Sequence, residues 1–151
     1  MNNKFTIPLI ALFLLLFMGI YFLVNPSYEK SIKAKYYFET GEYQQAYVLS
    51  KESFAEDQYN RMAATVMAQS LTSLKYVKYI DMAKSYMLEI DKIAQHEYIS
   101  DANKAKIRVI CDIMIQSYIK LAPSVITDKK LVQDSAYYYQ KFEKLLEKVT
   151  K

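Results

Sequence analysis

The first 24 residues differ sharply from the rest of the chain in their pattern of apolar and polar positions. Residues 5–24 read FTIPLIALFLLLFMGIYFLV, twenty residues without a charge. As a helix rising about 1.5 Å per residue, this run is about 30 Å long, which matches the hydrocarbon core of a bilayer. Tyr21 falls near its far end, where aromatic side chains favour the membrane interface. We therefore predict an N-terminal tail and a transmembrane anchor over residues 1–24.

Two other interpretations of this run stay open. A cleaved signal peptide has a shorter apolar stretch of about 7–15 residues, followed by small residues at the cleavage site. Here residues 23–26 read LVNP, which makes a poor cleavage site, and no Cys follows for a lipoprotein anchor. A buried core helix is disfavoured by the length and hydrophobicity of the run. An uncleaved single-pass anchor fits best.

The orientation of the predicted anchor rests on opposing signals. Lys4 precedes the apolar run, whereas Lys30, Lys33 and Lys35 follow within fifteen residues of it. Counted alone, these lysines favour a cytoplasmic domain by the positive-inside rule. The four-residue tail is typical of an anchor whose N-terminus is inside. We predict the N-terminus inside and the domain outside. The three lysines are either contacts for anionic headgroups or ordinary solvated residues.

Beyond the anchor, apolar residues recur at the three- and four-residue spacing of amphipathic helices. The whole chain contains only 2 Gly and 3 Pro, whereas all-β domains need a turn about every eight to twelve residues. The fold class is therefore all-α. We predict six helices in three antiparallel pairs, joined by short connections. They span residues 27–40, 43–54, 58–74, 77–94, 101–121 and 128–149.

Capping residues and apolar faces refine these helices. Asp57, Ser100 and Thr127 are predicted to cap the third, fifth and sixth helices. The fifth helix is apolar on most sides, with residues such as Val109 and Ile113 outside its main face, so we predict that it is central and buried. Apolar positions of the sixth helix alternate in four- and three-residue steps, which indicates a seam against one partner helix.

The first hairpin carries a recognisable signature, because residues 34–46 read AKYYFETGEYQQA. This stretch resembles a tetratricopeptide repeat. Ala34 and Ala46 match the small residues at which its two helices cross, and Tyr37 matches the aromatic residue of the first helix. Gly41 matches the turn, where a positive φ is needed, and Tyr43 matches the residue that fills the space between the helices.

A second, degenerate copy lies thirty-seven residues further on. Ile80 and Ala83 match Tyr43 and Ala46, but Lys78 stands where the glycine is expected. The last pair of helices offers only Ala136 and no turn signature. The resemblance implies a short tetratricopeptide-like α-solenoid of about three helical hairpins over residues 25–151, with the final amphipathic helix as a cap.

Residues that carry chemistry are scarce. His96 is the single histidine and lies in a polar connection without a nucleophile nearby, while Cys111, the single cysteine, lies on an apolar helix face. Carboxylates alternate with lysines at helical spacing, as on solvated helix faces. Glycine-rich phosphate loops and nucleophile elbows are absent from the sequence. We predict a protein that is not an enzyme, with no catalytic residue, metal, cofactor or small-molecule substrate.

The basic residues do not indicate nucleic-acid binding. The net charge is +4, the lysines are interleaved with acidic residues, and the chain has two arginines, Arg61 and Arg108. A nucleic-acid interface needs a continuous stripe of basic residues. We therefore predict protein partners and no nucleic acid.

Tyrosine is the unusual residue of this chain, with 15 copies and no Trp. Consecutive helical residues point about 100° apart, so adjacent tyrosines cannot all be buried. Exposed tyrosines favour protein interfaces, although rings around the edge of a small core are an equal alternative. The candidate partner-binding residues are Tyr36, Tyr76, Tyr79, Tyr137 and Tyr138.

Together these features predict a membrane-anchored scaffold or adaptor. The Lys-, Ile- and Tyr-rich composition resembles that of proteins from AT-rich bacterial genomes, and the plan is similar to periplasmic accessory scaffold proteins of bacterial flagellar motors. That resemblance implies a single-pass protein of the bacterial inner membrane with a periplasmic domain. A periplasmic chaperone-type adaptor beside the secretion translocon is the alternative, and a cytoplasmic docking adaptor applies if the orientation is reversed.

Overall fold

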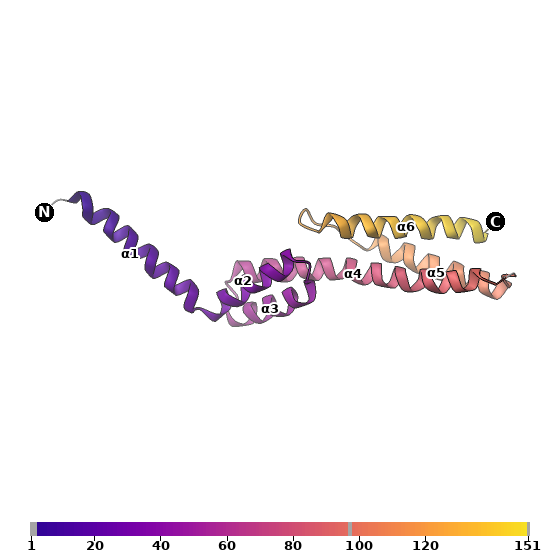
Figure 1. Ribbon diagram of the computed structural model, residues 1–151, viewed down its shortest axis with the longest axis horizontal. Helices are drawn as coiled ribbons and strands as arrows, with labels where there is room; N and C mark the ends of the chain where they lie inside the picture. The colour runs from indigo at the N-terminus through magenta and orange to yellow at the C-terminus, as the bar shows by residue number, and fades with distance from the viewer. Residues whose placement is uncertain (1–2, 97, 151) are drawn as a thin grey trace. The chain divides into compact units, whose positions relative to one another are not determined.

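The computed structural model describes residues 3–96 and 98–150, with the side chains of residues 3–5, 22 and 23 left out. Its described part is all-α, as predicted, and contains no strand (Figure 1). The helices are α1 (Asn3–Val24), α2 (Pro26–Glu39), α3 (Tyr43–Glu56), α4 (Arg61–Ala94), α5 (Asp101–Ile119) and α6 (Lys129–Thr150).

The prediction of two separate helices over residues 58–74 and 77–94 is wrong. Residues 61–74 and 77–94 belong to one helix, α4, which runs without a break for 34 residues, and residues 58–60 precede it. The expected break had no helix-ending residue behind it, because residues 70–80 (SLTSLKYVKYI) contain no Gly, Pro, Asn or Asp. Lys78, placed in a turn by the repeat comparison, is therefore a mid-helix residue. The three predicted hairpins reduce to α2–α3 and α5–α6, with a long helix between them in the chain.

The helices form two compact units, the first ending at Ser70 and the second beginning at Leu71. In the first unit, α2 and α3 make a tight hairpin (Figure 1). Its core is built from small residues: Ala34 and Ala46 are fully buried and cluster with Val66 of α4. Because these side chains are short, the helix backbones approach closely.

A buried polar network joins the same three helices. Asn60 precedes α4 and is fully buried, and its amide Nδ2 donates to Oγ of Ser27 at 3.0 Å and of Ser31 at 3.2 Å. Ser27 and Ser53 exchange hydrogen bonds, because each hydroxyl donates to the other residue's carbonyl oxygen, at 2.9 and 2.6 Å. The Oδ1 of Asn60 accepts from the N–H of Ala63 at 3.1 Å, so this residue also caps α4.

One residue separates α1 from α2. Asn25 is extended, with φ −82° and ψ 111°, and its side chain accepts from the N–H of Ser27 at 3.1 Å. Pro26 disfavours the helical conformation at the residue before it, so α1 cannot continue into α2. The axis turns by 76° between residues 6–21 and 26–39. The Asn–Pro pair therefore creates the bend.

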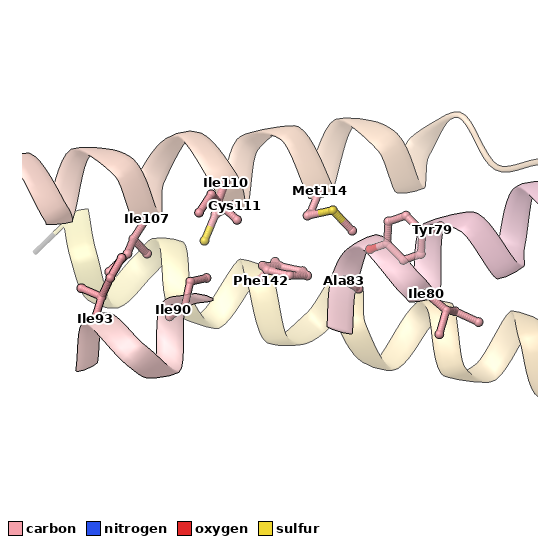
Figure 2. Packing of buried hydrophobic residues seen from close by; sticks show 10 residues of the cluster. All are labelled: Tyr79, Ile80, Ala83, Ile90, Ile93, Ile107, Ile110, Cys111, Met114 and Phe142. Carbon is pink, nitrogen blue, oxygen red and sulfur yellow. The ribbon is translucent and has the colours of Figure 1, made fainter. Parts of the chain in front are cut away.

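The second unit packs the C-terminal part of α4 against α5 and α6. Its buried residues come from all three helices and are Tyr79, Ile80, Ala83, Ile90, Ile93, Ile107, Ile110, Cys111, Met114 and Phe142. Figure 2 shows the ring of Phe142 at the centre of this cluster, beneath Cys111 and Met114 of α5. The apolar face predicted for the sixth helix is buried, since Ser135 and Phe142 are fully buried on it, but the core that it enters contains residues of both α4 and α5 and not of one partner helix.

Two further expectations are corrected. The fifth helix is not buried on all sides: Val109 is 57% and Ile113 is 41% exposed, because in the described chain its core partners come from α4 and α6 on one side. The caps also differ. Asn60, not the predicted Asp57, caps α4. Asp128, not Thr127, caps α6 by accepting from the N–H of Lys130 at 2.8 Å, whereas the cap at Ser100 is confirmed.

Candidate functional surfaces

Helix α1 presents apolar side chains on every side. The large apolar residues described between Ile7 and Val24 are all between 56% and 75% exposed. The helix contacts α2 at the bend, and none of its residues enters either buried cluster. An exposed apolar surface of this size marks a site that binds a membrane or another protein.

By length and composition, no single helix in the described part of the chain qualifies as a membrane span. The bent pair formed by residues 6–21 and 26–39 qualifies only when its two helices are taken together. The predicted anchor therefore stays a prediction.

A second exposed apolar surface lies where α5 turns toward α6. Ser124 and Thr127 close a turn, because the N–H of Thr127 donates to the carbonyl of Ser124 at 3.0 Å and the N–H of Ser124 donates to Oγ1 of Thr127 at 2.9 Å. The two central residues, Val125 and Ile126, are fully and 57% exposed, and Ile119 nearby in sequence is 63% exposed. Such turn positions normally carry Gly, Pro, Asn or Asp. We call Ile119, Val125 and Ile126 the turn patch.

The sequence analysis missed the turn patch. Its signal was present, because two β-branched residues stand between Ser124 and Thr127, which are typical turn residues. Only the hydrogen-bonded turn shows that both apolar side chains point outward.

Three candidate tyrosines lie at least partly on the surface. Tyr36 is exposed on α2 and meets Tyr37 edge-on at 5.9 Å between ring centroids. Tyr137 is exposed on α6, with the Lys141 ammonium 4.6 Å from its ring centroid. Contact with Tyr137 raises the pKa of Lys141, which keeps this lysine charged. Tyr138 is partly buried against the core of the second unit.

The other two candidates are not on the surface. Tyr76 is 2% and Tyr79 is 3% exposed, so neither of these candidates presents the exposed ring that a partner interface requires. Residues three apart on a helix lie on the same face, which explains why both are buried. Burial also raises the pKa of each phenol, so both stay neutral.

These buried tyrosines belong to an aromatic cluster in the second unit. The ring of Tyr118 lies 5.8 Å from that of Tyr79 and stacks on Tyr139 at 4.4 Å. Tyr139 donates to Glu143 at 2.5 Å. A pocket of about 220 Å³ lies beside Tyr76, Tyr118 and Tyr139. Sites for drug-sized ligands occupy about 300–1,000 Å³, so this pocket is too small for such a ligand and is a gap in the packing of the side chains.

The residues matched to a tetratricopeptide repeat have the predicted local geometry in the first hairpin. Gly41 has φ +85°, and a Cβ there would meet no atom within 4 Å, so its role is conformational. Tyr43 is buried and meets Phe38 edge-on at 5.5 Å. Tyr37 is partly buried against the Ala34–Ala46 cluster. Ala83 is fully buried, but within α4 and not in a hairpin.

The residues able to do chemistry do not assemble into a site. His96 is exposed in the connection after α4. Cys111 is fully buried, and burial raises the pKa of its thiol to about 11, so it is a poor nucleophile. Glu89 pairs with Lys106 at 2.5 Å, as in an ordinary surface ion pair. In the described part of the chain, no group of three His, Cys, Asp or Glu side chains could hold a metal ion.

Comparisons with known proteins identify no relative: the chain matches no family model, no curated protein and no solved structure.

Proposed function

We propose that this chain is a membrane-anchored adaptor that is not an enzyme and that binds protein partners through its helical domain. The observation that carries the proposal is α1, whose large apolar side chains, as far as they are described, are more than half exposed and lie in a twenty-residue run without charge. A bilayer is the apolar phase that covers such a helix at lowest cost. The anchor holds the helical domain at the membrane and raises its effective concentration for partners there.

The partner surface that we propose is the turn patch. Burying Val125, Ile126 and Ile119 against a protein removes apolar area from water at about 25 cal/mol per Å². Their turn is already held by two hydrogen bonds, so little ordering entropy opposes binding. Tyr137 is a second exposed aromatic residue in the same unit.

The assembly that we propose is the periplasmic scaffold of a bacterial flagellar motor at the inner membrane. The tetratricopeptide resemblance in this proposal is supported by the α2–α3 hairpin, in which Gly41 lies at the turn and Ala34 and Ala46 lie where the two helices cross. A chaperone-type adaptor beside the translocon is the competing function, and the experiment below separates the two.

Fractionation of cells tests the anchor. The chain should pellet with membranes, resist high salt and alkaline carbonate, and be released by detergent. Leu12→Lys with Leu16→Lys places two charges on α1 and should release the chain. Val109→Lys with Ile113→Lys is a matched control, because it also replaces two aliphatic residues by lysine at the same spacing, on an exposed face of α5. Extraction of the unchanged protein by carbonate would contradict the anchor.

Labelling with a membrane-impermeant maleimide tests the orientation. Cys111 is buried and its thiol pKa is raised, so a Lys144→Cys variant has one reactive thiol, on the exposed face of α6. Labelling with the inner membrane intact supports a periplasmic domain. Labelling only after lysis would support a cytoplasmic docking adaptor.

Photo-cross-linking in cells tests the partner surface. A benzophenone amino acid at Val125 should cross-link a few motor proteins in constant ratio, whereas the same group at exposed Gln140 should not. A broad set of exported proteins with translocon subunits would favour the chaperone. Equal cross-linking at the two positions would refute the turn patch.

A further inference from the structure

We infer that α2 is an interfacial helix, whose outer face lies in the headgroup region of the bilayer that α1 enters. The inference rests on the proposed anchor and adds a second contact with lipid. Ile32 and Tyr36, one helical turn apart on this face, would lie among the lipids. The first observation is the bend, which begins one residue after α1 ends.

The bend limits how far α2 can rise from the membrane. Its 14 residues measure about 21 Å at about 1.5 Å per residue. With α1 along the membrane normal, the 76° turn leaves only the cosine component of that length, about 5 Å, as height gained over the whole helix. The polar layer on each side of a bilayer is about 5–7 Å thick. Helix α2 therefore stays within this layer from end to end.

The packing of the first unit leaves one face of α2 free to meet lipid. Ser27, Ser31 and Ala34 are buried and lie on the face that packs on α3 and α4. Ile32 is 55% exposed and Tyr36 is 63% exposed, and both lie on the opposite side of the helix. An aliphatic residue beside a tyrosine is the pair that membrane interfaces favour, because the phenol hydroxyl stays in the polar layer.

The charges on α2 are compatible with this placement. Lys30 faces α3, where it pairs with Glu56 at 2.6 Å and Glu52 at 3.3 Å. Lys33 and Lys35 pair within α2, with Glu29 at 2.6 Å and Glu39 at 3.8 Å, and all four of these side chains are more than half exposed. The outer face is therefore close to neutral. We expect it to bind zwitterionic and anionic bilayers alike.

The chain contains no Trp, so a single introduced Trp is an unambiguous reporter of depth. The full chain is reconstituted in phosphatidylcholine vesicles, and in vesicles with phosphatidylglycerol, containing lipids brominated at shallow or deep acyl positions. Tyr36→Trp reports on α2, Phe13→Trp on α1, and Tyr59→Trp on the exposed connection between α3 and α4.

The expected result is a blue-shifted emission from Trp at position 36, quenched more by shallow than by deep bromines. Trp at position 13 should be quenched by deep bromines, and Trp at position 59 should be quenched by neither. Quenching at 13 without quenching at 36 would overturn the interfacial helix and leave the anchor intact. Absence of quenching at 13 would overturn the anchor itself. Shielding at 36 that appears only with a protein partner would assign this face to a protein.

A second variant tests the role of the bend. Asn25→Ala with Pro26→Ala removes the cap and the proline that stop α1 from continuing into α2. In this background Trp at position 36 should lose its quenching and shift to the red, while Trp at position 13 remains quenched. Unchanged quenching at 36 would show that the bend does not hold α2 at the membrane.

Discussion

Replacement of Asn60 tests the buried polar network of the first unit and, with it, the direction of each hydrogen bond. The hydroxyls of Ser27 and Ser53 both donate to carbonyl oxygens, and Ser31 donates to the carbonyl of Tyr28 at 2.9 Å. The serine oxygens therefore face Asn60 as acceptors. Only the amide group, with its two N–H donors, satisfies them.

Asn60→Asp has almost the same shape but removes these donors and adds a buried charge. Its carboxylate can still cap α4 through the N–H of Ala63. It loses two buried hydrogen bonds worth about 1 kcal/mol each, and it leaves an unpaired charge, so the free energy of unfolding should fall by at least about 3 kcal/mol at pH 7. Asn60→Ala should cost about 2–4 kcal/mol, because it loses the cap as well as the hydrogen bonds.

The pH dependence separates charge from shape. In the folded Asp variant the carboxyl pKa should be raised, because burial and the facing oxygens disfavour the charged form. Its loss of stability should therefore be smallest below about pH 4, the pKa of an unfolded Asp, and should grow as the pH rises toward the folded pKa.

Urea unfolding of the full chain in detergent, followed by circular dichroism, measures both effects. Gln58→Glu makes the same chemical change two residues away at an exposed position and should have little effect. An Asp variant as stable as the unchanged protein at pH 7 would refute the donor and acceptor assignment.

Three further predictions concern the two units. Phe142→Ala should destabilise the second unit by about 3–5 kcal/mol, measured by thermal unfolding, because the ring is fully buried at the centre of the core; a loss below about 1 kcal/mol would contradict that packing. Gly41→Ala should cost about 1 kcal/mol through its positive φ alone, and Glu42→Ala is the control, because this neighbouring residue is exposed and its side chain makes no capping hydrogen bond. Cys111 should resist iodoacetamide in the folded chain, because a pKa of about 11 leaves about one thiolate in ten thousand at pH 7, and it should react after unfolding in urea; rapid labelling of the folded chain would refute its burial.

Local signals along the chain determined the helical class and most helix boundaries. Gly41 and Tyr43 delimit the first hairpin, and Ser100 caps α5, because caps and turns depend on a few neighbouring residues. The same is true of the bend, since an Asn–Pro pair restricts the backbone regardless of what packs around it. The apolar run of α1 is likewise evident from sequence.

Tertiary structure decided which residues are buried and where the long helix runs, which the periodicity of the sequence does not determine. The prediction from apolar spacing divided α4 in two, although residues 70–80 contain no Gly, Pro, Asn or Asp to end a helix. Whether an apolar residue is buried depends on which helices lie against it. Val109 is exposed although its helix was expected to be buried, and Tyr76 is buried although it was a candidate for an exposed interface. The turn patch also depends on the fold, because the bonds between Ser124 and Thr127 direct Val125 and Ile126 outward. Backbone restrictions are local and can be predicted from the sequence, whereas the burial of a residue depends on residues that are distant from it in the chain.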